Sequence, residues 1–214
     1  MKIFLFFTVM ILASCSDKKI NNISKVNSDE KQQIQSKSKK NNTKENKIGF
    51  LVLKNTYNQK NLLTIYNSDK SKWKSFKFND IFEDKDIAPE AVKPENTLLV
   101  FKCLGKKNGF YKIVVNEEKN IVKYVDELDI NFKYQSLEQH ILSIFSVDFN
   151  ESDNSLKLQP QEKAKQILKN KDSFYYPIKI DKNWLMVEDD NKNRFWIRWC
   201  DKNGNLILEL YYDA

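Results

Sequence analysis

The clearest alternation of apolar and polar positions lies between Asn183 and Tyr212, in NWLMVEDDNKNRFWIRWCDKNGNLILELYY. Short runs rich in aromatic and β-branched residues are separated there by polar turns, which is the pattern of antiparallel strands. The predicted strands are Trp184–Val187, Phe195–Trp199 and Leu206–Tyr212. Asn203-Gly204 precedes the third strand and is a strong hairpin signal, because Gly tolerates a positive φ.

A similar order of runs occurs once earlier in the chain, at a lag of about 74–80 residues. The matched pairs are Leu62–Asn67 with Ile141–Ser146, Thr97–Lys102 with Ser173–Lys179, Phe110–Ile113 with Trp184–Val187, Val122–Tyr124 with Ile197–Trp199, and Leu128–Tyr134 with Leu206–Tyr212. Five matches in the same order favour a duplication over chance. The sequence therefore predicts a mainly β protein with two small units, at 48–134 and 135–214.

Each unit carries a polar insert between its second and third strands. In the second unit Pro160–Leu168 begins with Pro and continues with good helix formers, so a short helix is expected. The counterpart Asn79–Val92 is expected to hold a helical turn, limited by Pro89 and Pro94.

The N-terminus has the pattern of an export signal. Met1–Ser14 contains Lys2 followed by an apolar run that is too short to span a bilayer permanently. Its end, Leu12-Ala13-Ser14-Cys15, resembles the lipobox of bacterial lipoproteins. The resemblance implies that residues 1–14 are removed and that Cys15 becomes an acylated membrane anchor. The alternative is an ordinary signal peptide with an incidental Cys.

The residues after Cys15 bear on localisation. Ser16, rather than Asp, follows the Cys, which by resemblance to the usual sorting pattern implies the outer membrane of a cell envelope. Surface-exposed lipoproteins of Bacteroidota often carry an acidic cluster here. Ser16–Lys19 has a single acid, Asp17, so surface and periplasmic display both remain open.

Residues 15–47 are expected to form a flexible tether. Residues 16–47 contain no aromatic residue and hold nine Lys against four Asp or Glu. Such a segment cannot bury enough apolar area to offset the entropy of ordering the chain. Removing these charges and Lys2 from the formal charge of +7 leaves +1 for residues 48–214. That near-neutral balance argues against nucleic acid as a partner.

Two segments of the second unit resemble bacterial SH3-like domains, in which a "gWykV" strand is followed by a "GWv" strand. They are Asp181–Val187 and Arg194–Trp199. The resemblance covers most of 135–214 and, more faintly, 48–134, and it implies two small SH3-like β-barrel units in tandem. The Gly before each aromatic is replaced by Asn183 and Phe195, and the early R-x-x-P segment by Phe145–Asp148. These departures bear on the ligand groove of the family more than on its fold.

Catalytic chemistry is not expected. His140 is the one histidine, and it lies at the edge of the apolar run Ile141–Phe145, where a surface or packing role is expected. Cys103 lies in an apolar strand and Cys200 follows Trp199, so neither has the setting of an activated thiolate. No metal-ligand spacing or phosphate-binding loop is present, so no metal and no cofactor are predicted.

Cys103 and Cys200 leave two interpretations open. Export to an oxidising compartment would permit a disulfide between them. Two separate buried cysteines are the alternative, and it is favoured because the two positions do not correspond in the repeat.

The aromatic positions suggest a binding surface. Phe195, Ile197 and Trp199 should face the core, because alternate residues of a strand share a face. Trp196 and Arg198 then face outward, and with Tyr211 they form the predicted ligand surface. Packing of Trp196 against the other unit is the alternative, and for Trp196 it is the favoured interpretation. The leading functional hypothesis is a non-enzymatic, lipid-anchored envelope protein that binds a cell-wall peptide, a glycan or an envelope protein. A scaffold lipoprotein is second, and a cell-wall hydrolase is least favoured.

Overall fold

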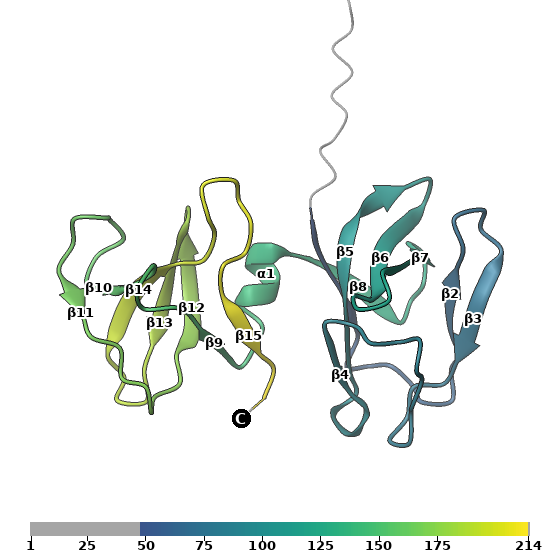
Figure 1. Ribbon diagram of the computed structural model, residues 1–214. Helices are drawn as coiled ribbons and strands as arrows, with labels where there is room; N and C mark the ends of the chain where they lie inside the picture. Colours follow the sequence, from purple (N-terminus) through teal and green to yellow (C-terminus); the bar gives the residue numbers. More distant parts are fainter. Residues whose placement is uncertain (1–47, 214) are drawn as a thin grey trace, which may run out of the picture. The chain divides into compact units, whose positions relative to one another are not determined.

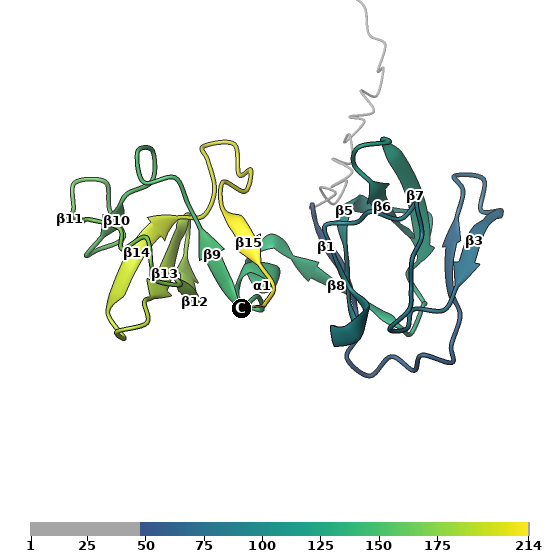
Figure 2. The same ribbon diagram turned by 60° about the horizontal axis from the view of Figure 1, so that its bottom comes forward.

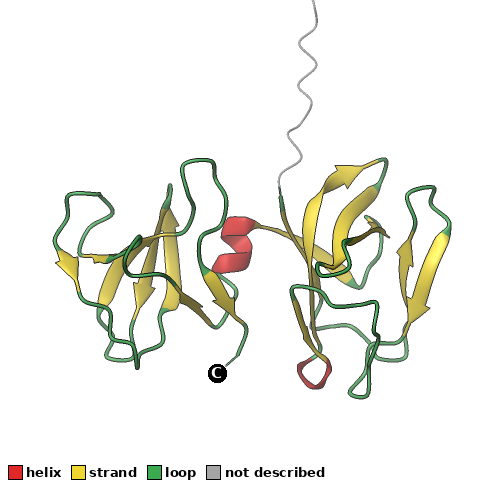
Figure 3. Ribbon diagram, viewed as in Figure 1, coloured by secondary structure: helices red, strands yellow, loops and turns green. Residues whose placement is uncertain are grey.

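The computed structural model describes residues 48–213, which belong to one compact unit. The signal peptide at 1–14, the lipidation of Cys15 and the tether at 15–47 were predicted for residues that lie outside this range. Within it, the mainly β prediction is confirmed, since short antiparallel strands dominate and the single α-helix has five residues (Figure 3). No described helix is long and apolar enough to cross a membrane.

The first sheet is antiparallel and contains eight strands (Figure 1). Its strand order is β3-β2-β7-β6-β5-β1-β8, and β4 pairs with β5 beside this path. The bounds are β1 Gly49–Leu53, β2 Leu63–Tyr66, β3 Lys72–Phe76, β4 Ala91–Lys93, β5 Leu98–Lys107, β6 Phe110–Asn116, β7 Ile121–Asp126 and β8 Phe132–Ser136. A 3₁₀ turn, η1 at Pro94–Asn96, leads into β5.

Strand β1 is buried on both faces. Leu51 and Leu53 enter the main core of the first sheet, whereas Phe50 and Val52 enter a smaller cluster on the opposite face. Figure 2 shows the strands of the first sheet curling round. Gly49 is required where β1 meets β8, because a Cβ there would lie 2.3 Å from the carbonyl oxygen of Gln135.

The second part contains a five-stranded sheet and a two-stranded ribbon. The sheet order is β11-β10-β14-β13-β12, and β9 pairs with β15 in the ribbon. The bounds are β9 Ser146–Asp148, β10 Leu156–Lys157, β11 Gln166–Ile167, β12 Tyr176–Asp181, β13 Trp184–Glu188, β14 Arg194–Arg198 and β15 Glu209–Tyr211. Leu185, Val187, Ile197 and Trp199 share a core with Val147 and Leu208.

Strand pairing follows the same order in the two parts. The path β3-β2-β7-β6-β5 in the first corresponds to β11-β10-β14-β13-β12 in the second. The remaining strands also correspond, since β1 pairs with β8 and β9 pairs with β15. The sequence alignment placed Ile141–Ser146 opposite β2, and this pair is wrong. By pairing order, the counterpart of β2 is β10, because β2 pairs with β7 and β10 with β14.

The prediction of β-barrel units is wrong in one respect, because neither part is a closed barrel. Strands β3 and β8 end the first path without pairing to each other. In the second part β12 and β9 are in separate sheets, although the amide of Val147 donates to the carbonyl of Tyr175 at 3.0 Å. Strands β11 and β15 have two and three residues, which is too short to carry a ladder around a barrel.

The predicted helical inserts are also wrong. Pro160–Leu168 forms turns and strand β11 instead of a helix, and 79–92 contains turns and the start of β4. The α-helix is α1, Leu137–Ile141, and it ends where the apolar run Ile141–Phe145 begins. Its cause is a capping box, in which the amide of Gln139 donates to the Ser136 hydroxyl and the amide of Ser136 donates to the Gln139 side chain.

Candidate binding site

Trp196 and Arg198 lie where the alternation predicted, on the outer face of β14. Phe195, Ile197 and Trp199 face the core on the other side. Trp196 is nevertheless only 8% exposed. The pairing register places it between Met186 of β13 and Lys157 of β10, and the Lys179 ammonium lies 5.4 Å from the centre of its ring. Trp196 is therefore buried and not part of an exposed ligand surface, and the neighbours that surround it belong to its own sheet.

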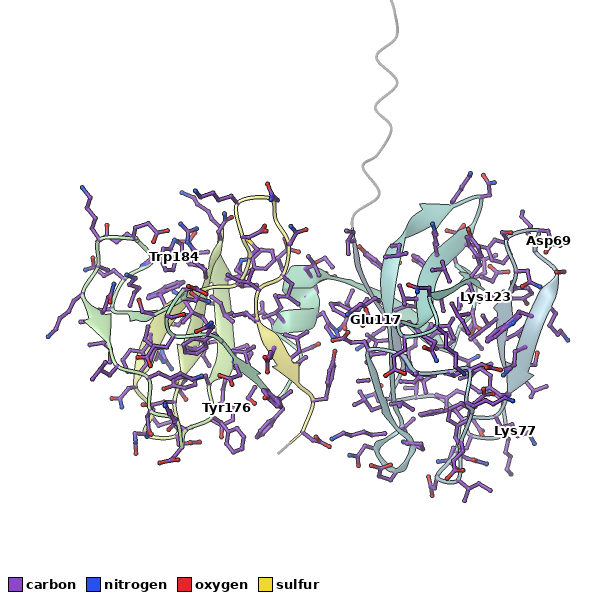
Figure 4. All side chains as sticks on the ribbon, in the orientation of Figure 1. Asp69, Lys77, Glu117, Lys123, Tyr176 and Trp184 are labelled. Atoms are coloured by element: carbon purple, nitrogen blue, oxygen red, sulfur yellow. The ribbon has the colours of Figure 1, made fainter. Side chains whose placement is uncertain are left out.

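Arg198 is occupied by neighbours in the same way. Its guanidinium carbon lies 4.3 Å from the ring centre of Trp184, which is labelled in Figure 4, and it forms an ion pair with Glu162. Its backbone amide donates to the Asn154 side chain at 2.8 Å. These contacts make Trp196 and Arg198 a packed sheet surface rather than an open binding face.

Tyr211 lies elsewhere, on β15, directly opposite Ser146 of β9. The structure therefore keeps one of the three predicted residues exposed and does not bring it together with the other two. Tyr211 instead lines a groove with a volume of about 670 Å³. The groove is lined by Ser146, Val147, Asp148, Phe149, Asn150, Glu151, Lys169, Lys171, Ser173, Phe174 and Tyr211.

Two aromatic side chains in the lining of this groove are unusually accessible. Phe174 is 45% exposed and Tyr211 is 44% exposed. Phe174 is held by an edge-on contact with Phe145, with ring centres 5.3 Å apart. Phe145 in turn packs edge-on against Tyr176, which is labelled in Figure 4. Because packing supports Phe174 from behind, its ring can contact a ligand without first being ordered.

The polar groups of the groove come from β9, from the loop that follows it and from the segment before β12. The Lys169 ammonium forms an ion pair with Asp148, donates to the Phe149 carbonyl at 3.0 Å and lies 4.5 Å from the Phe149 ring centre. The Glu151 carboxylate accepts the amide of Lys169 at 2.8 Å. Lys169 is thus fixed by three neighbours, and it holds the loop against the strand.

Ser146 is the exception to this satisfied network. Its side chain is buried, with 1% of the residue exposed, and its hydroxyl has no hydrogen-bond partner among the described residues. Buried hydroxyls are paired in the great majority of cases, because an unpaired one loses its hydration without compensation. Ser146 lines the groove next to Tyr211, so a molecule in the groove could supply the missing partner.

The phenol of Tyr211 stays protonated at neutral pH. Desolvation raises its pKa first, and the nearby carboxylate of Glu209 raises it further. The phenol of Tyr176 donates a hydrogen bond to the Asp190 carboxylate, and this hydrogen bond raises the pKa of Tyr176 as well. Both groups therefore remain neutral hydroxyls in the range where proteins work.

His140 packs inside the molecule. It is 2% exposed, and its ring stacks on Phe50 with centres 3.9 Å apart. Its two ring nitrogens lie 2.8 Å from the Gln135 side-chain oxygen and 2.9 Å from the Tyr212 hydroxyl. Burial lowers the pKa of His140 to about 4, so the ring is neutral at pH 7. This is the packing role that the sequence favoured.

Cys103 and Cys200 are both buried and both free. Cys200 belongs to the core of the second part, whereas Cys103 lies on β5 and its thiol is 3.5 Å from the Gly105 carbonyl. Burial raises the pKa of each thiol. The structure thus has two separate buried cysteines and no disulfide between them, which is the interpretation that the sequence favoured. The described residues contain no group of three metal-ligating side chains.

Neither Cys103 nor Cys200 is expected to react with iodoacetamide while the protein is folded, because the thiolate is the reactive form and burial disfavours it. Both should react fully in denaturant without a reducing agent. Mass spectrometry of the native and unfolded protein measures this. Failure to label in denaturant until a reductant is added would show that the thiols are paired.

The sequence interpretation missed Phe174 and Ser146. Phe174-Tyr175-Tyr176 carries a usable signal, because Tyr175 is buried while its two neighbours point away from the core. No local signal marks Ser146, since its position beside Tyr211 depends on the pairing of β9 with β15. Comparisons of this chain with protein-family models, with curated proteins and with solved structures return no match.

Proposed function

We propose that this chain is a lipid-anchored, non-enzymatic binding protein of a bacterial envelope, and that its folded part holds two SH3-like units. The lipobox-like Leu12-Ala13-Ser14-Cys15 supports the anchor and outer-membrane placement. The repeated strand order supports the tandem units, because in each the first and last strands pair, and because β5-β6-β7 and β12-β13-β14 form matching meanders. The absence of barrel closure sets these units apart from compact SH3-like barrels.

The observation that carries the binding role is the groove beside β9. It presents two accessible aromatic side chains, Phe174 and Tyr211, next to a small number of polar groups. Ligand sites in proteins typically combine apolar and aromatic walls with a few placed polar groups. The partner is expected to be a cell-wall component or another envelope protein, reached from the membrane through the tether.

Pull-down with purified sacculi tests this function. The full chain, held in detergent micelles, should sediment with sacculi, and Tyr211→Ala should reduce the bound fraction. Ile207→Ala is a matched control, because Ile207 is also partly exposed but does not line the groove. Equal binding by wild type and Tyr211→Ala would remove the groove from the function, and no binding by any form would remove the cell-wall partner.

The second candidate, a scaffold lipoprotein, is favoured by apolar side chains away from the groove. Leu128 and Ile130 are 80% and 76% exposed in the turn before β8. Exposed apolar side chains of this kind are found where another protein docks. Co-purification of a partner that is lost in Leu128→Ser with Ile130→Ser, but kept in Tyr211→Ala, would support this role.

A further inference from the structure

We propose that the groove between Phe174 and Tyr211 binds a neutral saccharide, with a pyranose ring on the aromatic faces and a sugar hydroxyl paired with Ser146. This inference rests on the proposed binding function and names its ligand class. It does not depend on whether the saccharide belongs to a polymer or is free.

The walls of the groove fit one face of a sugar. A pyranose ring presents C–H groups above and below its mean plane and hydroxyls around its edge. Aromatic rings bury apolar area at little cost in side-chain entropy, and their electron-rich faces attract polarised C–H groups. Phe174 and Tyr211 are accessible at 45% and 44%, so each keeps about half of its surface for such contact.

The unpaired Ser146 hydroxyl fits the edge of a sugar. A sugar hydroxyl is both donor and acceptor, as is Ser146, so the two groups can pair in either direction. Ser146 lies on β9, lines the groove and is paired directly opposite Tyr211 of β15. A ring that stacks on Tyr211 therefore places its hydroxyls near the one buried polar atom that lacks a partner within residues 48–213.

The charges of the groove favour a neutral ligand. Its lining has two acids, Asp148 and Glu151, and two bases, Lys169 and Lys171. Asp148 and Lys169 form an ion pair, and the other two charged residues, Glu151 and Lys171, are of opposite sign, so the lining has no net charge. A site for a charged ligand would gather an excess of charge of the opposite sign, which this lining does not.

The backbone of β9 argues against an extended peptide. Along one edge β9 pairs with β15, and on the other side the amide of Val147 donates to the Tyr175 carbonyl. A peptide that binds by adding a strand needs an unpaired strand edge, and both sides of β9 already have hydrogen-bond partners. The groove offers hydroxyls and aromatic faces, which suit a saccharide better.

Calorimetric titration of the full chain in detergent micelles tests the proposal. The probes are the tetramer of N-acetylglucosamine, the linear tetramer of glucose, and a cell-wall stem peptide. At least one neutral tetramer should bind. Phe174→Ala and Tyr211→Ala should each weaken it about tenfold, as expected from losing one aromatic contact. Ile207→Ala should leave binding unchanged.

Ser146→Ala separates ligand recognition from a structural role. It should weaken the tetramer about three- to tenfold, the effect of one neutral hydrogen bond. In the absence of saccharide the same change should raise the urea midpoint of unfolding, because it removes an unpaired buried hydroxyl. A saccharide affinity unchanged by Ser146→Ala would overturn the assigned role of this hydroxyl.

The other outcomes of the titration separate failure of the saccharide proposal from failure of the proposed envelope-binding function. Binding of the stem peptide and of neither tetramer would overturn the saccharide and leave a binding protein. Tetramer binding that is insensitive to Phe174→Ala and Tyr211→Ala would overturn the groove as its location. Sacculus binding with no response to any of the three probes would also overturn the ligand class, while the envelope function would stand.

Discussion

Changing Trp199 to Ala is expected to lower the free energy of unfolding by about 3–5 kcal/mol, the cost of deleting a large buried aromatic side chain. Trp199 is 6% exposed and lies in the core that the second sheet shares with the ribbon. Its indole N–H donates to the Lys182 carbonyl at 2.7 Å, so the change also leaves that carbonyl without its donor. Urea unfolding followed by circular dichroism measures the loss, which is a large share of the total stability of an ordinary domain.

Trp199→Phe is the matched control, because it keeps an aromatic ring in the core and removes only the N–H and part of the volume. Its expected cost is about 1–2 kcal/mol. Tyr211→Ala, at an exposed position, should change stability by less than about 1 kcal/mol. If Trp199→Ala and Tyr211→Ala had similar effects, Trp199 would not be the core anchor described above.

Acid is expected to destabilise the folded chain through His140. The pKa of its ring is lowered from 6.5 to about 4 in the folded protein, chiefly by burial and secondarily by Lys133. As pH falls below 6.5, the unfolded chain therefore binds a proton that the folded chain does not, and stability decreases. Linkage gives a loss of about 2 kcal/mol between pH 7.5 and pH 5. Urea midpoints across this range measure it.

This effect can be assigned to one residue because the chain has a single histidine. His140→Gln keeps a polar group that can reach Tyr212 and removes the titration, so its stability should be nearly flat between pH 7.5 and pH 5. The pH range ends at 5 because several carboxyls, among them Asp86 and Glu188, have lowered pKa values, and their protonation reduces stability further at more acid pH. A wild-type slope that persists in His140→Gln would assign the acid sensitivity to other groups.

The strands were predictable where local alternation and burial agree. Trp184 to Val187 and Phe195 to Trp199 correspond to β13 and β14 within one residue, and the core-facing side of β14 was identified correctly. Such strands are specified by side chains two apart, and that information is present in the sequence. The exposure of Trp196 was not predictable in this way, because it is set by Lys157 and Lys179 on strands that pair only in the fold.

The helix was missed although its signal is present. Ser136 and Gln139 have the spacing of a capping box, but the apolar run that follows suggested a strand. The candidate site could not be predicted from local sequence patterns. Tyr211 was expected beside Trp196 because Leu206–Tyr212 looked like one strand, whereas β15 begins only at Glu209 and pairs with β9. The groove is assembled by that distant pairing, which no local pattern encodes.

The open ends of the first sheet bear on how copies of the chain avoid one another. Strands β3 and β8 end the ladder, and within 48–213 nothing pairs with their outer edges. Unpaired edges are templates for association with other strands, and lysines on an edge oppose this because pairing would bury or align their charges. Lys72 on β3 and Lys133 on β8 are both exposed. Each end of the unclosed sheet therefore carries its own protection against edge-to-edge aggregation.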